Sequence, residues 1–361
     1  MKNLHIEKNI VPLYQMIQKD IYPIYIWGVG ALANHAHAYC DKFDIKVSGF
    51  FVNTVVNEKE FQGLPVFELN ELIKNHQHFS VIIGHSNYEK GLHDLDGIQN
   101  VENVYCISAL CYSIYHLITE EFIKEKSEII NHMFEELEDD LSKGCLQSYF
   151  ETRINDNSKY MFPYYKQGNA YYLNDIFELG DKELLLDIGA FVGNMIWPFV
   201  ESTHGKYKGI IAVEPDEENF TQLQENVEKR RVDKVILRKE CIYNRKGYVN
   251  FNGEQEYGGI FDQEDGGKLC LATTIDSLCT ELGVEQDVSI IKINFPYAVS
   301  EILEGGKFIL QKTKPKIIIR AGFDENVLLS AYEIIKKTNP EYKIYLRYTI
   351  GMPQGLTLFA I

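Results

Sequence analysis

The stretch LLLDIGAFVGN (184–194), followed by IIAVEPD (210–216), decides the predicted fold of this chain. Each begins with a short apolar run of the kind that a buried parallel strand needs. Each also carries a carboxylate near its end, Asp187 in the first and Glu214 in the second. In an open α/β sheet the ligand crevice lies outside the carboxyl ends of the strands. The two stretches therefore predict two strands of such a sheet with a binding site at their ends.

The residues that end these strands suit an adenosine without a pyrophosphate. Gly189 and Gly193 have no side chain to keep a ligand away from the backbone, and Glu214 can accept two hydrogen bonds from a ribose diol. A dinucleotide fingerprint would need glycines at the first, third and sixth positions, whereas only Gly-x-x-x-Gly is present. The pattern favours S-adenosylmethionine. The alternative is that the glycines only shape a strand-to-helix turn.

Size and composition limit the class of protein. A chain of 361 residues is long enough for two domains. Its 52 acidic and 36 basic residues give a net charge of -16, which disfavours long nucleic acid and anionic membranes as partners. Seven cysteines without a Cys-x-x-Cys pair favour a reduced, cytoplasmic location. We also expect no signal peptide, no membrane span and no metal site, and a homo-oligomer is left open.

A smaller Rossmann-like α/β domain is predicted for residues 1–109. The expected strands are 22–30, 46–52, 80–84 and 103–107. The first turn reads GVGALA (28–33), a dinucleotide-type fingerprint with alanine in the last place. An NAD ribose would need an acidic residue after the next strand, where the chain has Asn53. Gly28, Gly30 and Asn53 thus mark a second nucleotide site for which NAD is disfavoured.

Residues 110–170 are predicted to form a helical connector, because their apolar positions have helical spacing and the run FEELEDDL (134–141) is strongly acidic. From 171 to 361, strands alternate with helices, which predicts a doubly wound sheet. After the two opening strands, the expected strands are 235–237, 288–293, 316–320, 343–348 and 356–360. The glycine-rich segment 253–267 is expected to be a loop at the rim of the site.

From about residue 142 to its end, the chain resembles the FkbM-type methyltransferases, which methylate hydroxyl groups of sugars and natural products. The matching pieces are DIGAFVG (187–193), EP (214–215), Asn226, Cys241, KG (246–247), Phe251, TIDSL (274–278), IKI (291–293), LEG (303–305), YLR (345–347) and TLF (357–359). The resemblance implies a Rossmann-like methyltransferase sheet, mostly parallel with an antiparallel C-terminal strand. It also implies S-adenosylmethionine as cofactor and a sugar, nucleotide sugar or related metabolite as acceptor.

The same resemblance implies which residues hold the cofactor. The loop that would hold the methionine part contains Asp187, Gly189, Ala190, Phe191, Val192, Gly193 and Asn194. Glu214 would hold the ribose, while Pro215, Asp216 and Cys241 would border the adenine. Tyr172, from an aromatic-rich segment before the sheet, is added to this set. The first domain is similar to the small Rossmann-like domains of sugar-modifying enzymes, through GVG (28–30), SGF (48–50) and GLPV (63–66), which implies nucleotide-sugar recognition or a scaffold.

The acceptor side departs from the family. Where the family usually has KIDVEGAE, this chain has KINFPYAV (292–299), so three carboxylates are replaced. Lys292, Asn294 and Tyr297 are the candidate catalytic residues, and the alternative for each is a structural hydrogen bond. Asn294 can orient a hydroxyl but cannot take its proton. Two other functions follow as alternatives: a regulatory protein that binds the cofactor without turnover, and a nucleotide-sugar or NAD-binding protein that acts through its N-terminal domain.

Overall fold

The computed structural model describes residues 4–9, 11–53, 59–75, 78–85, 88–108, 118–165, 171–172, 175–252, 259–261 and 268–361. It divides into two compact units. The first unit is Met1–Glu128, Gly144–Gln167 and Ile350–Pro353, and the second is Ile129–Lys143, Gly168–Thr349 and Gln354–Ile361. The segment 110–170, predicted as a connector, is thus shared between the two units, and a separate connector with those bounds stays a prediction.

The first unit contains a six-stranded sheet with the order β3-β4-β2-β1-β5-β6. Its strands are β1 (Ile24–Trp27), β2 (Val47–Val52), β3 (Glu60–Phe61), β4 (Leu64–Glu68), β5 (Phe79–Ile83) and β6 (Val101–Tyr105). All neighbours are parallel except β3 and β4. These two strands were not predicted. They form a hairpin whose turn residues, Gln62 and Gly63, both have positive φ, as a tight turn of this kind requires.

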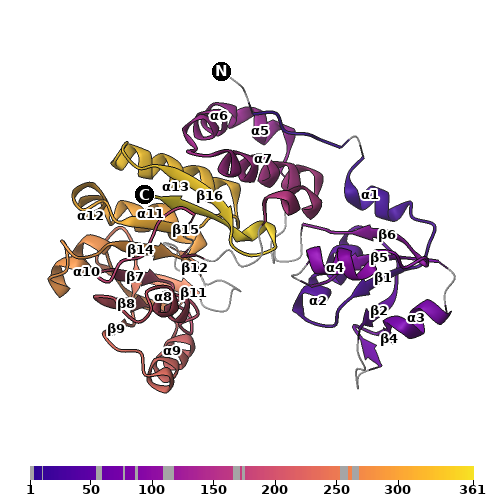
Figure 1. Ribbon diagram of the computed structural model, residues 1–361, viewed down its shortest axis with the longest axis horizontal. Coiled ribbons are helices and arrows are strands. Elements are labelled where there is room, and N and C mark those ends of the chain that lie inside the picture. The colour runs from indigo at the N-terminus through magenta and orange to yellow at the C-terminus, as the bar shows by residue number, and fades with distance from the viewer. Residues whose placement is uncertain are drawn as a thin grey trace. The chain divides into compact units, whose positions relative to one another are not determined.

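The first unit also contains the helices α1 (Leu13–Gln18), α2 (Ala31–Lys42), α3 (Leu69–Asn75), α4 (Tyr88–Leu95), α5 (Glu120–Glu125) and the 3-10 helix η1 (Ser158–Tyr164). Of these, α2, α3 and α4 lie beside this sheet in Figure 1. Helix α7 (Asp140–Asn155) begins in the second unit and ends in the first. Apolar side chains of β1, β2 and β5, among them Ile26, Phe50 and Ile82, form the core with α2. The alternation of strands and helices gives this unit the α/β class that was predicted.

The second unit is built on a seven-stranded sheet with the order β16-β17-β15-β14-β7-β8-β9. Its strands are β7 (Leu184–Ile188), β8 (Gly209–Val213), β9 (Val235–Arg238), β14 (Ile290–Ile293), β15 (Lys316–Arg320), β16 (Ile344–Tyr348) and β17 (Leu356–Ala360). Strand β17 is antiparallel to β15 and β16, and the other neighbours are parallel. The predicted doubly wound sheet with an antiparallel C-terminal strand is confirmed.

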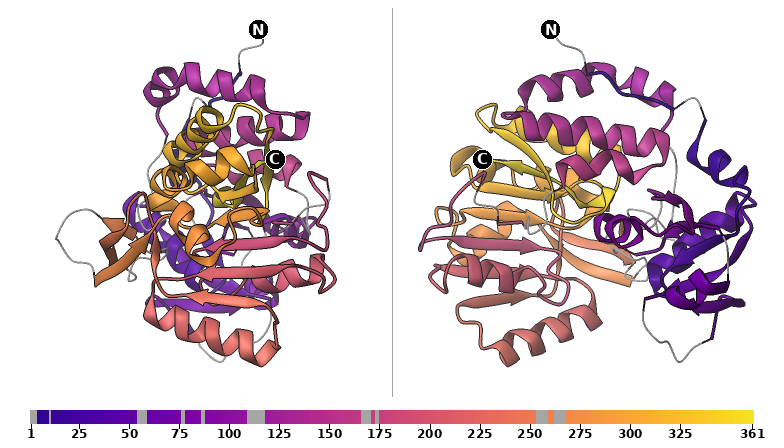
Figure 2. Two further views of the ribbon diagram at one scale, coloured as in Figure 1. Left: turned by 90° about the vertical axis from the view of Figure 1, so that its left-hand side faces the viewer. Right: turned by 45° about the vertical axis from the view of Figure 1, so that its right-hand side comes forward.

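The helices of the second unit connect these strands. They are α6 (Ser127–Glu136), α8 (Ile196–Ser202), α9 (Glu217–Arg230), α10 (Ile275–Leu282), the 3-10 helix η2 (Pro296–Ala298), α11 (Val299–Glu304), α12 (Lys307–Lys312), α13 (Glu325–Thr338) and the 3-10 helix η3 (Pro353–Gly355). Helix α9 lies beside β9 in Figures 1 and 2 alike. Leu185 and Ile290 pack with Phe199 and Leu223, so one sheet face is covered by α8 and α9.

A second, four-stranded sheet with the order β10-β13-β11-β12 was not predicted. Its strands are β10 (Cys241–Ile242), β11 (Gly247–Asn252), β12 (Gly259–Phe261) and β13 (Lys268–Thr273). The segment 253–267, expected to be a loop, contains β12, and its other residues lie outside the described part of the chain. Strands β10 and β12 have only two and three residues, and β11 and β13 begin or end with polar residues or glycine, so none was recognised by the long apolar runs that indicated the larger sheet.

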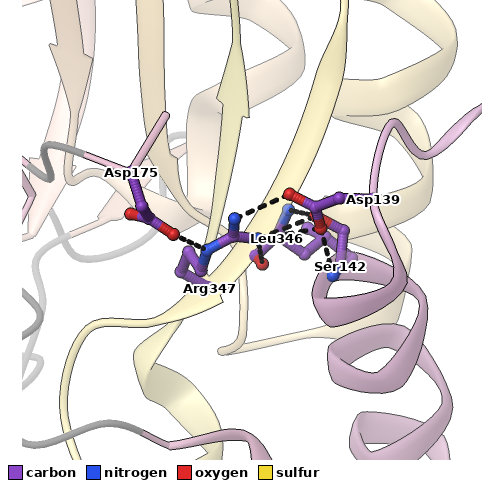
Figure 3. A network of polar contacts seen from close by, with 5 residues as sticks. All are labelled: Asp139, Ser142, Asp175, Leu346 and Arg347. Carbon is purple, nitrogen blue, oxygen red and sulfur yellow. Dashed lines mark hydrogen bonds and ion pairs between the residues drawn. The ribbon is translucent and has the colours of Figure 1, made fainter. Parts of the chain in front are cut away.

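A polar network fastens the start of α7 to the edge strand β16 (Figure 3). Arg347 of β16 is buried, and its guanidinium donates to both oxygens of Asp139, at 3.2 and 2.7 Å, and to Ser142 at 2.9 Å. On its other side it donates to Asp175 at 2.8 Å. One arginine therefore joins three parts of the second unit that are distant in sequence.

Candidate cofactor-binding site

The loop after β7 passes very close to the end of β14. Gly189 has a φ of +72°, and a Cβ at this position would lie 2.7 Å from the backbone oxygen of Asn294. The amides of Gly189 and Ala190 both donate to the carbonyl oxygen of Val213, at 3.0 Å each. Only glycine fits this conformation and this close approach. Gly189 therefore allows the ends of β7, β8 and β14 to meet at one edge of the sheet.

A buried ion pair lies at this edge. Asp187 and Lys292 are register partners in β7 and β14, and Nζ of Lys292 lies 2.7 Å from Oδ1 of Asp187 and 3.2 Å from the carbonyl oxygen of Gly189. Both side chains are at most 1% exposed. Burial raises the pKa of Asp187 above its usual range, although the charge and hydrogen bond of Lys292 act to lower it. Oδ2 of Asp187 has no hydrogen-bond partner among the described residues.

Glu214, directly after β8, is the second buried carboxylate. Its two oxygens accept hydrogen bonds from the amides of Phe191 at 2.8 Å and Asp216 at 3.1 Å. Burial raises the pKa of Glu214, although these amides lower it. Each oxygen keeps a lone pair for a further donor. Asp216 instead caps α9, since its Oδ1 accepts from the amides of Glu218 and Asn219.

A small apolar hollow opens at the same ends of the strands, and its lining includes the residues on either side of Glu214. It is lined by Ile188, Gly189, Val213, Pro215, Glu240, Cys241, Ile242, Phe295 and Ile302. Of the predicted cofactor residues it contains Gly189, Pro215 and Cys241.

Glu240 and Phe295 are two of the lining residues that the sequence analysis did not predict. Glu240 is buried and accepts a hydrogen bond from Nε of Arg238 at 2.6 Å. It follows β9, so the rule that pointed to Glu214, a carboxylate after an apolar strand, could have found it as well. Phe295 follows β14, and its ring stacks on Phe251 with centroids 6.0 Å apart. No sequence signal indicated that contact, because the partner lies in the unpredicted sheet.

The later part of the loop after β7 faces a different hollow. Val192, Gly193 and Asn194 line a space of about 560 Å³ together with residues of α8 and α9. The side-chain Nδ2 of Asn226 holds this part of the loop by donating to the backbone carbonyl oxygen of Val192 at 2.9 Å. The structure therefore brings Asp187, Gly189, Glu214, Pro215 and Cys241 to one edge, and it separates Val192 to Asn194 from the apolar hollow.

The remaining candidates of the second unit differ in exposure. Tyr172 is buried, its hydroxyl donates to the carbonyl oxygen of Met195 at 3.4 Å, and burial together with the nearby charge of Asp187 raises its pKa. Phe191 and Tyr297 are about half exposed, at 47% and 48%. Oδ1 of Asn294 is buried and has no hydrogen-bond partner among the described residues. Lys292, Asn294 and Tyr172 thus lie on or near the edge that carries Asp187.

The predicted second nucleotide site lies at the carboxyl ends of β1 and β2. Gly28 has a φ of +123°, and a Cβ there would lie 3.0 Å from the backbone oxygen of Gly84, so backbone packing alone accounts for this glycine. Gly30 precedes α2, and Asn53 follows β2. A ligand at these residues stays a prediction. In the described part of the chain, no cluster of three or more His, Cys, Asp or Glu side chains could hold a metal, and no helix is long and apolar enough to span a membrane.

No protein-family model matches the chain, and no curated protein sequence matches it. Among solved structures, the methyltransferase FkbM from Methylobacillus flagellatus KT aligns with a TM-score of 0.70 and 15% sequence identity, over 96% of this chain and 92% of that chain. The precorrin-6y C5,15-methyltransferase from Geobacter metallireducens GS-15 aligns with a TM-score of 0.31 and 16% identity, over 46% of this chain and 67% of that chain. The first likeness shows a shared fold, and it extends beyond residues 142–361, where the sequence resemblance was found.

Proposed function

We propose that this protein is an S-adenosylmethionine-dependent methyltransferase. The observation that carries the proposal is the set of buried, incompletely bonded acceptors at one sheet edge, next to an apolar hollow. Oδ2 of Asp187 has no partner among the described residues, and each oxygen of Glu214 retains a lone pair. Such acceptors need donors from a ligand, because a buried acceptor left unbonded costs about 1–3 kcal/mol. The fold shared with an FkbM methyltransferase supports the same conclusion.

Each part of this edge has a distinct task in the proposed function. Asp187 would accept from the ammonium of the methionine part, Glu214 from the ribose hydroxyls, and the hollow at Pro215 and Cys241 would exclude water from the adenine. Lys292 compensates the charge of Asp187 and fixes its orientation. The bound cofactor supplies an electrophilic methyl group on a sulfonium. The protein then contributes mainly the alignment of an acceptor lone pair with that methyl group.

The acceptor expected from the sequence resemblance is a hydroxyl of a sugar, nucleotide sugar or related metabolite. A screen for methyl transfer from labelled S-adenosylmethionine should begin with these compounds. A protein that binds the cofactor without turnover would pass every binding test below and transfer no methyl group to any acceptor. Methyl transfer to one defined acceptor would exclude that alternative.

Calorimetric titration should give micromolar binding of S-adenosylmethionine and S-adenosylhomocysteine, without binding of NAD. Glu214→Gln should weaken the adenosyl ligands by about 10- to 100-fold, since it removes one charge-assisted acceptor from the ribose. The matched control is Glu217→Gln, which changes an exposed carboxylate three residues further along the chain. Equal affinities in the two variants would contradict the assignment of Glu214.

The alternative site in the first unit can be blocked separately. Gly30→Trp places a large ring where a Cβ meets nothing within 4 Å, so the fold tolerates the change. Adenosyl binding should be unaffected by this variant. A loss of binding in Gly30→Trp but not in Glu214→Gln would move the adenosyl site to the first unit.

Adenosyl binding should weaken in mild acid. Burial raises the pKa of both Asp187 and Glu214, so both carboxyls become protonated above the usual range near pH 4. Protonation removes the charge that attracts the ammonium and one acceptor from the ribose. The raised pKa values mean that these two groups do not themselves destabilise the fold on acidification. Titrations of S-adenosylhomocysteine from about pH 8 down to about pH 4 would measure the effect, and a constant affinity over this interval would refute it.

A further inference from the structure

Asn294 follows β14 directly and lies against the loop after β7, residues 189–194. The backbone N–H of Asn294 donates to the backbone carbonyl oxygen of Ile188 at 3.0 Å, which continues the pairing of β14 with β7. The backbone carbonyl oxygen of Asn294 is the atom that a Cβ on Gly189 would contact. The side chain of Asn294 therefore starts beside the loop that, under the proposed function, holds the methionine part of the cofactor.

The carboxamide oxygen of Asn294 needs a donor that the described chain does not provide. Oδ1 is buried and unbonded, while Asn294 as a whole is only partly buried. The nearest cation in sequence, Lys292, directs its Nζ to Asp187 and to Gly189. A buried acceptor without a donor costs about 1–3 kcal/mol, so a donor from a bound ligand would stabilise this site.

The carboxylates of this edge are engaged elsewhere. Asp187 is paired with Lys292, Glu214 is held by two backbone amides, and Glu240 is paired with Arg238. Residues 294–299, NFPYAV, include no carboxylate, histidine or cysteine. A hydroxyl must lose its proton as it attacks, and this requires a base that takes the proton or a metal that lowers the pKa of the hydroxyl. A neutral amino group can attack before it loses a proton, and its N–H groups are the donors that Oδ1 of Asn294 lacks. When the amino group is attached to a planar ring, its lone pair is shared with the ring, and a hydrogen bond from N–H to Oδ1 increases the electron density on nitrogen.

An exposed aromatic ring follows Asn294. Tyr297, in the 3-10 helix η2, is 48% exposed, and Phe295 before it is buried against Phe251. The buried aromatic pair fixes the start of η2, while the ring of Tyr297 is accessible to a ligand. Stacking of a planar ring on such a side chain contributes about 1–3 kcal/mol of binding free energy.

We propose that the acceptor is an amino group on a planar ring and that Oδ1 of Asn294 accepts a hydrogen bond from it. The inference rests on the proposed function and replaces the expected sugar hydroxyl with a nitrogen. In the transfer the nitrogen lone pair forms the N–C bond while the S–C bond breaks and its electron pair remains on sulfur. The products are S-adenosylhomocysteine and an N-methylammonium, which releases one proton to water. Asn294 orients the amine and remains neutral throughout.

The test compares acceptors that differ in one group. The full chain is incubated with tritiated-methyl S-adenosylmethionine and with the pairs adenosine and inosine, cytidine and uridine, and aniline and phenol, together with uridine diphosphate glucose. We expect label only in the amino member of a pair, and mass spectrometry should place the methyl group on nitrogen. Each nucleoside pair shares its ribose hydroxyls, so these are matched within the pair.

Variants of Asn294 test its role in the same assay. Asn294→Leu has a similar size but no acceptor, and it should slow labelling of the amine by about 10- to 100-fold. Asn294→Asp keeps an acceptor and should restore most of the lost activity. Asn294→Leu should still bind S-adenosylhomocysteine, which a general loss of structure would not allow. Tyr297→Leu should raise the KM of the amine more than Tyr297→Phe does.

Each other outcome is decisive. Preferential labelling of a hydroxyl, or full activity of Asn294→Leu, would overturn the amine assignment. A protein that binds S-adenosylhomocysteine but labels none of the amines would also overturn it, while the cofactor assignment would stand. A protein that binds no adenosyl ligand would instead remove the proposed function itself.

Discussion

Lys292→Met is expected to lower the free energy of unfolding of the second unit by about 3–5 kcal/mol, because it leaves a buried carboxylate without its cation. Asp187 and Lys292 are 2.7 Å apart and at most 1% exposed, so water cannot replace the lost partner. The double variant Asp187→Asn/Lys292→Met should recover most of the loss, since no charge then remains buried.

Tryptophan fluorescence can follow this unit by itself. The chain has two tryptophans, Trp27 in the first unit and Trp197 in the second. In a Trp27→Phe background, denaturant unfolding is reported by Trp197, over whose ring the Arg230 guanidinium lies at 5.2 Å. A single variant as stable as its parent would show that Asp187 is uncharged in the folded protein.

The double variant also separates stability from binding. It removes the charge that the proposed function assigns to the methionine ammonium, so it should be folded yet bind S-adenosylhomocysteine at least about 10-fold more weakly. Parental affinity in a stable double variant would contradict the role of Asp187 and leave its structural role intact.

Arg347→Met is the second change with a large expected effect, a loss of about 2–4 kcal/mol from the second unit. The guanidinium is buried and forms the contacts with Asp139, Ser142 and Asp175 drawn in Figure 3. The two carboxylates are partly exposed, which makes the loss smaller than for a fully buried pair. Arg347→Lys should recover only part of the lost stability, because a single ammonium cannot bond Asp139 and Asp175 together as the planar guanidinium does.

The same network should affect stability in acid. Burial acts to raise the pKa of Asp139, but the hydrogen bonds of Arg347 and Ser142 outweigh it and the pKa is lowered. A carboxyl whose pKa is lowered by folding stabilises the protein at any pH above its pKa in the unfolded chain, which is about 4. This stabilisation is lost as the pH falls from there through the lower pKa of the folded protein. Denaturant unfolding at about pH 7 and about pH 3 should therefore show a smaller acid loss in Arg347→Met than in the parent. An equal loss in both would exclude Asp139 as a source of acid sensitivity.

The sequence by itself determined the large sheet of the second unit and one edge of its site. The strands predicted at 316–320 and 356–360 have those bounds in the structure, and β7 and β8 come from the two stretches that pointed to an adenosyl ligand. Apolar runs carry this information because a strand covered on both faces must be apolar along its length. Asp187 and Glu214 were found for the same reason, since each is the carboxylate at the end of such a run.

Only the tertiary structure decided which residues share the site. Strands β10 to β13 were not recognised from their sequences, and they became evident only through their pairing. Lys292 and Asp187 are 105 positions apart, and Arg347 and Asp139 are 208 apart. Their contacts depend on the register of strands and on where α7 begins, neither of which is encoded in the residues next to them. The close approach of the Asn294 backbone to Gly189 is likewise a distance that no local pattern contains.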